Sequence, residues 1–179
     1  MNLQYKFQFN ILTALSYIIL FVFQQHFLFP LQQQFFNFGV LSGSLLFFPH
    51  GVRVLSVLLG GIWILPGLLI GHLVTAIYHL EILNYTEVFL RAILSMLSIY
   101  LPYYLLNLKN ISLRNILILA VLSSILNSLF QSFYLQLSMI NLDPYLIFSY
   151  LIGDLLGSLV LFYFIKYIQN LYIIFSSKN

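Results

Sequence analysis

Three ionisable residues lie within stretches of sequence that are otherwise apolar. His50 and Arg53 belong to the stretch 47–53, Phe-Phe-Pro-His-Gly-Val-Arg, and Asp154 is the only acidic residue deep in an apolar run. An arginine at the centre of a membrane helix costs about 2.5 to 3.5 kcal/mol on insertion scales, so it is normally paired or shielded from lipid. We therefore predict that Arg53 and Asp154 meet near the membrane midplane, with His50 on the same helix face as Arg53.

Such a polar centre has two alternative roles. It forms a site for a small ligand or ion, or it is a buried ion pair that only orients two helices. Tyr150 shares the helix face of Asp154 and is included in the candidate site. His72 is interpreted either as a core histidine bonded to a neighbour or as a proton-sensitive group near the pair.

Two further runs carry polar residues at helical spacing and should face the interior of a bundle. Asn127 and Gln131 belong to the first of these stripes, and we include both in the candidate site. Hydrogen bonding between helices is the simpler interpretation of the stripes, and substrate contact is the alternative. The stripes are Ser124, Asn127, Ser128 and Gln131, and Arg91, Ser95, Ser98 and Pro102.

The remaining residues provide no recognisable chemistry. The chain has no cysteine, and no nucleophile elbow, phosphate loop, metal-ligand spacing or paired carboxylates are present. We therefore expect a protein that is not an enzyme and that holds no metal or cofactor. The seven lysines and arginines are spread along the chain, so no nucleic-acid partner is expected.

Composition places the chain in a lipid bilayer. Of its 179 residues 61% are hydrophobic and only 6% are charged, which a soluble core with a polar surface cannot reach. At roughly 20 residues per crossing, the chain has room for about six transmembrane helices. We predict an all-α integral membrane bundle that forms one domain, 1–179. The expected spans are about 9–29, 35–60, 62–80, 88–106, 116–137 and 145–168.

Charge and proline placement refine this map. An N-in, C-in orientation puts all five of the loop and terminal basic residues on the cytoplasmic side, as the positive-inside rule requires. Pro49 and Gly51 predict a kink or break in the second span, because proline removes a backbone hydrogen bond and clashes with the preceding turn. The five basic residues are Lys6, Lys109, Arg114, Lys166 and Lys178.

Glycine spacing indicates which helices pack closely. All nine glycines lie in the second, third and sixth spans or at the junction of the first two of these. Pairs four residues apart let helix backbones approach each other in lipid. We therefore predict that these three spans form a close-contact core. The pairs are Gly39/Gly43, Gly67/Gly71 and Gly153/Gly157.

Three stretches of the chain resemble the motifs of MASE-type membrane-associated sensor domains. They are 49–60, Pro-His-Gly-Val-Arg-Val-Leu-Ser-Val-Leu-Leu-Gly, 65–71, Leu-Pro-Gly-Leu-Leu-Ile-Gly, and 152–157, Ile-Gly-Asp-Leu-Leu-Gly. The resemblance implies a sensory module of the bacterial cytoplasmic (inner) membrane. It also implies a ligand pocket that involves Pro49, Gly51 and Asp154. We expect a stand-alone relative without an output domain of its own.

Three functions follow as hypotheses. The first is a sensor-like module that binds a small ligand or ion and transmits its state to a separate signalling partner. The second is a substrate-capture subunit of an energy-coupling-factor transporter, a class that also uses about six helices. The third is a structural subunit of a larger membrane complex, in which Arg53 and Asp154 would only determine packing.

Overall fold

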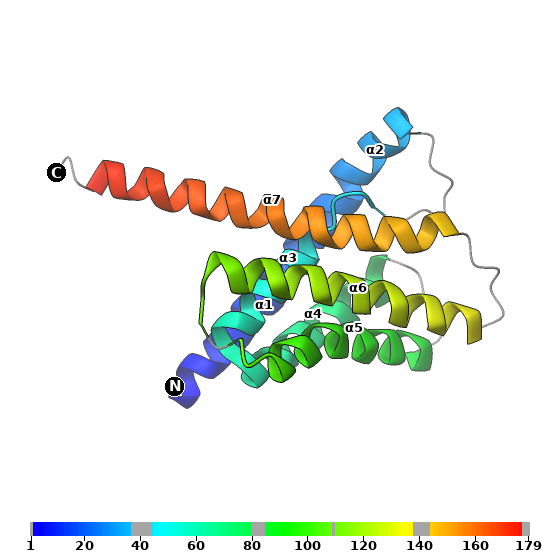
Figure 1. Ribbon diagram of the computed structural model, residues 1–179, viewed down its shortest axis with the longest axis horizontal. Helices are drawn as coiled ribbons and strands as arrows, with labels where there is room; N and C mark the ends of the chain where they lie inside the picture. The colour runs from blue at the N-terminus through cyan, green and yellow to red at the C-terminus, as the bar shows by residue number, and fades with distance from the viewer. Residues whose placement is uncertain (1, 37–43, 80–84, 109, 138–143, 177–179) are drawn as a thin grey trace.

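The chain folds into a bundle of helices (Figure 1). The computed structural model describes residues 2–36, 44–79, 85–108, 110–137 and 144–176, and it contains no β-strand within these ranges. Five helical runs are long and apolar enough to cross a membrane, which is the architecture of a multi-pass membrane protein. The count of six crossings and the N-in, C-in orientation stay predictions. The runs are Leu3–Phe35, Phe48–Tyr78, Tyr85–Leu105, Leu113–Tyr134 and Ile147–Asn170.

The first run is longer than its predicted span. Helix α1 (Leu3–Phe23) continues through a π-helical turn, η1 (Gln24–Leu28), into α2 (Phe29–Phe36). The backbone N–H of Phe29 donates to the carbonyl of Gln24 across this wider turn. We attribute the turn to Pro30, whose ring would otherwise clash with the carbonyl four residues before it.

The second predicted span is not one continuous helix. α3 covers Phe48–Gly60, and residues 44–47 before it are not helical. Of the predicted kink or break, the structure shows the break, and it lies before Pro49 rather than inside a helix. Pro49 lies in the first turn of α3, where the missing N–H would have no partner in the helix. The pair Gly39/Gly43 lies outside the described residues.

The run Phe48–Tyr78 is not one straight crossing, because the chain reverses direction at Gly61. The short turn η2 (Gly61–Ile64) joins α3 to α4 (Leu65–His79), and Gly61 has a φ of 57°. Contacts with α1 establish the reversal, since α3 runs antiparallel to α1 and α4 runs parallel to it. For α3 the contacts are Thr13 with Ser56 and Phe21 with Phe47, and for α4 they are Asn10 with Gly67 and Tyr17 with His72.

Three longer helices complete the bundle: α5 (Tyr85–Leu105), α6 (Leu113–Leu137) and α7 (Pro144–Ser176). α6 packs between α5 and α7, and α3 packs along α7. The start of α1, the end of α7, the α3–α4 turn and the start of α6 lie toward the same side of the bundle (Figure 1). The positive-inside rule predicts that this side is cytoplasmic.

Glycines bring α3 and α7 into close contact. A β-carbon on Gly51 would lie 2.9 Å from Cδ2 of Leu161, and one on Gly153 or Gly157 would overlap the backbone of Ser44 or Phe47. The pair Gly153/Gly157 therefore marks a close contact between the second and sixth predicted spans, as its spacing predicted. The third predicted span does not join them.

The glycines of the third predicted span, which lie in α4, face α1 instead. A β-carbon on Gly67 would lie 2.9 Å from Cα of Asn10, and one on Gly71 would lie 3.1 Å from Cβ of Tyr17. Glycine spacing predicts that a helix makes a close contact, but it does not predict which helix is the partner. Any helix whose surface fits against the glycine face can pack there.

The reversal at Gly61 gives a first prediction. Gly61→Ala should lower the free energy of unfolding by about 1 to 3 kcal/mol, because only glycine adopts this left-handed backbone conformation without strain. The new methyl group would also lie 3.1 Å from the hydroxyl of Tyr103. Unfolding followed by circular dichroism during titration with a denaturing detergent measures the loss. The matched control is Ile62→Ala at the exposed neighbouring position, and an equal loss in both variants would contradict the backbone argument.

Candidate functional site

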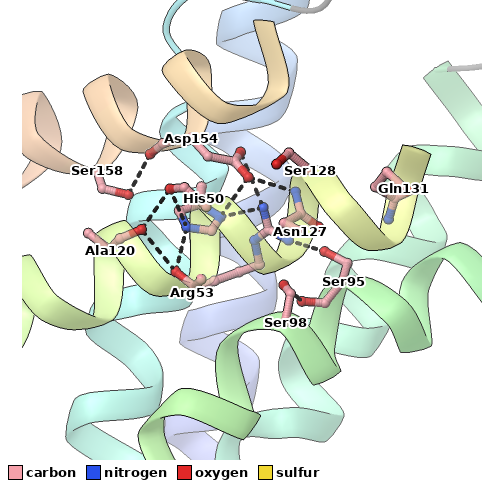
Figure 2. Close-up of polar contacts among 12 residues, drawn as sticks. His50, Arg53, Ser95, Ser98, Ala120, Asn127, Ser128, Gln131, Asp154 and Ser158 are labelled. Atoms are coloured by element: carbon pink, nitrogen blue, oxygen red, sulfur yellow. Dashed lines mark hydrogen bonds and ion pairs between the residues drawn. The ribbon is translucent and has the colours of Figure 1, made fainter. Parts of the chain in front are cut away.

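Four polar side chains from three helices converge in the bundle interior, and we call them the charged centre (Figure 2). Each is at most 4% exposed. The first turns of α3 supply a histidine and an arginine on one face, and α6 and α7 supply an amide and a carboxylate opposite them. The charged centre consists of His50, Arg53, Asn127 and Asp154.

Asp154 is the acceptor that joins the helices. Nδ2 of Asn127 donates a hydrogen bond to its Oδ2 at 2.6 Å, and Nδ1 of His50 lies 3.2 Å from the same oxygen. Nη2 of Arg53 lies 3.5 Å from Oδ1, while Nη1 donates to the hydroxyl of Ser95 on α5. Arg53 and Asp154 therefore meet as the sequence predicts, and the pair links α3, α5, α6 and α7.

His50 has competing partners at one nitrogen. Its Nδ1 lies 3.2 Å from the carboxylate of Asp154 and 2.6 Å from Nη2 of Arg53, which is always a donor. A neutral imidazole with a proton on Nδ1 satisfies Asp154, and one without it satisfies Arg53. At the opposite nitrogen, Nε2 lies 2.8 Å from the hydroxyl of Ser123, which donates or accepts. The ring can therefore adopt either of two hydrogen-bonding states without moving.

The order Ser123, His50, Asp154 is also that of a nucleophile, base and orienting acid. Two observations argue against such chemistry here. The guanidinium of Arg53 competes with Asp154 for Nδ1, and Ser123 is completely buried. The arrangement favours an internal hydrogen-bond network over a site at which a substrate is attacked.

Two polar atoms of the charged centre have no hydrogen-bond partner among the described residues. They are Nε of Arg53, a donor, and Oδ1 of Asn127, an acceptor, and both are shielded from solvent. An unpartnered buried polar group typically costs about 1 to 3 kcal/mol. A hydrogen-bond acceptor placed at Nε and a donor placed at Oδ1 would satisfy them.

The other predicted site residues bond elsewhere. Nδ1 of His72 lies 3.1 Å from the hydroxyl of Tyr17. Arg91 on α5 donates from Nε to Oε1 of Gln131 at 3.2 Å and from Nη2 to the hydroxyl of Tyr150 at 3.3 Å. Gln131 and Tyr150 thus belong to a second network around Arg91.

Sequence reasoning missed Ser123. It selected Ser124 from the polar stripe, and the hydroxyl of Ser124 donates mainly to the carbonyl of Ala120 at 2.6 Å. Ser123 lies four residues before Asn127, so the same helical spacing includes it. Only the position of His50 decides which of the two adjacent serines is the closer partner.

The Tyr17–His72 contact gives a second prediction. Tyr17→Phe should lower the free energy of unfolding by about 1 kcal/mol, the usual net worth of one hydrogen bond, because the ring still fills its buried site. Unfolding in mixed detergent micelles measures the loss. Tyr78→Phe at an exposed position on α4 is the control. A loss no larger than that of the control would show that the hydroxyl contributes nothing.

The fold and the charged centre define a helical integral membrane protein with ionisable groups in its interior. Comparisons with protein-family models, curated proteins and solved structures found no match to this chain. The resemblance to MASE-type domains therefore rests on its motifs alone. Within the described residues, no group of three histidine or acidic side chains is placed to hold a metal ion.

Proposed function

We propose that this chain is a sensor-like, non-enzymatic module of a bacterial cytoplasmic membrane that binds a small ligand or ion at the charged centre. The observation that supports this most directly is the competition at Nδ1 of His50, since Asp154 and Arg53 cannot both be satisfied there. A ligand that engages either group favours one hydrogen-bonding state over the other.

The contact between α3 and α7 provides a route for coupling to a separate partner. His50 and Arg53 lie on α3 and Asp154 on α7, and glycines hold the two helices in backbone contact. A change in the charged centre therefore acts on the relative position of these helices. The motif resemblance to MASE-type sensor domains supports the same class of function.

Capture of a substrate for an energy-coupling-factor transporter is the second candidate. The interrupted backbone at 44–47 and the start of α3 in the bundle interior favour it. Discontinuous membrane helices of this kind bind substrates in several transporters. A structural subunit of a membrane complex is the third candidate.

Affinity purification of the tagged chain from native membranes in mild detergent tests the three candidates together. Co-purification of a signalling kinase or cyclase would support the sensor module. A transport ATPase with its membrane coupling subunit would replace it with the capture subunit. Stoichiometric recovery in a membrane complex that contains neither a kinase or cyclase nor a transport ATPase would favour a structural role.

A further inference from the structure

A surface groove of about 610 Å³ lies where the start of α1 meets the α3–α4 turn. Asn10 fixes its walls, because Nδ2 donates to the carbonyl of Trp63 at 2.8 Å and Oδ1 accepts the backbone N–H of Gly67 at 2.6 Å. Leu3 and Phe7 of α1 line one wall of the groove. The groove is thus built from two segments tied together by hydrogen bonds from Asn10 to backbone groups, rather than from one loop.

A single cation lies among these apolar walls. Nζ of Lys6 is 3.4 Å from the ring centroid of Trp63, so the ammonium group sits on an aromatic face. A cation–π contact occupies one side of an ammonium group and leaves N–H donors for another acceptor. None of the residues that line the groove is acidic, so the groove has a net positive charge.

The position of the groove identifies the kind of acceptor. Lys6 lies near the beginning of the apolar run Leu3–Phe35, where a spanning helix enters the headgroup layer. The start of α6, with Arg114, and the C-terminal part of α7, with Lys166, lie toward the same side of the bundle (Figure 1). Phosphate groups of anionic lipids are the concentrated anions at this depth.

We propose that the groove binds an anionic phospholipid, with its phosphate on the ammonium group of Lys6. The upper part of an acyl chain lies against Leu3, Phe7 and Trp63. Trp63 has two roles in this site, because its ring supports the cation and its edge contacts the chain. This lipid site is independent of the function proposed for the charged centre.

Native mass spectrometry of the full chain tests the site. The protein is exposed to equal amounts of phosphatidylglycerol and phosphatidylcholine with identical acyl chains, and the retained lipid is counted. Wild type should prefer phosphatidylglycerol. Lys6→Gln should reduce its retention about fivefold, the effect of one basic residue near an anionic surface. Lys6→Arg should keep most of it. Lys166→Gln, which replaces an exposed lysine on α7, should leave it unchanged.

Several results would overturn the proposal. Equal retention of the two lipids by wild type would indicate an apolar groove without phosphate recognition. An equal loss in Lys6→Gln and Lys166→Gln would indicate diffuse attraction to the whole basic side. If Lys6→Gln does not fold, the salt dependence of wild type decides: raising the salt concentration must lower retention of phosphatidylglycerol but not of phosphatidylcholine.

Discussion

Asp154→Leu is expected to lower the free energy of unfolding by about 3 to 5 kcal/mol, the cost of breaking a buried ion pair from one side. The substitution leaves the guanidinium of Arg53 in the bundle interior without its carboxylate, and it removes the acceptor of Asn127. Unfolding followed by circular dichroism during titration with a denaturing detergent measures the change. Leu156→Val, at a more exposed position on the same helix, is the matched control.

The double variant Arg53→Met, Asp154→Leu tests whether the two charges interact directly. Because no unpaired charge remains buried, it should be more stable than either single variant. A double variant as unstable as the sum of the two single ones would contradict a direct interaction between the charges.

The charge-swapped pair, Arg53→Asp with Asp154→Arg, addresses function. Restoration of both folding and partner binding would indicate a structural ion pair. Restoration of folding alone would indicate that the charges contact a ligand, because a ligand would meet each charge in the wrong place.

Gly157→Val is expected to cost about 3 kcal/mol, the upper end of the range for overpacking a close contact. A β-carbon at Gly157 would overlap the backbone of Phe47, and backbone atoms cannot turn away as a side-chain end can. The residues just before α3 would have to move off α7, and His50 and Arg53 would move with them. The loss of free energy of unfolding is measured by circular dichroism during titration with a denaturing detergent.

Gly60→Ala provides the control for this substitution. Its new methyl group would lie 2.9 Å from the ring edge of Phe9, a side chain that can rotate away. We expect Gly60→Ala to cost less than Gly157→Ala, the smaller variant at the α7 position. Equal costs would mean that general glycine effects, and not the contact between α3 and α7, account for the loss.

The chain's membrane character, its helical class and the meeting of Arg53 with Asp154 could be predicted from the sequence. In lipid the backbone N–H and C=O groups must bond to each other, which favours helices in an apolar chain. An isolated buried charge needs a partner of opposite sign. Only one acidic residue lies deep enough to serve. These conclusions depend only on residue type and on the approximate depth of a residue in the membrane. Both can be read from the sequence.

The tertiary structure decided where the predicted kink or break falls and which helix packs against Gly67 and Gly71. It also decided the hydrogen-bond partners of His72, Tyr150 and Gln131. Periodicity gives the face of a helix on which a residue lies, but not which helix covers that face. For the same reason His72 is bonded to Tyr17 of α1 rather than to the charged centre. The contact depends on how α1 lies beside α4, and it is set by packing of the whole bundle rather than by any local run of residues.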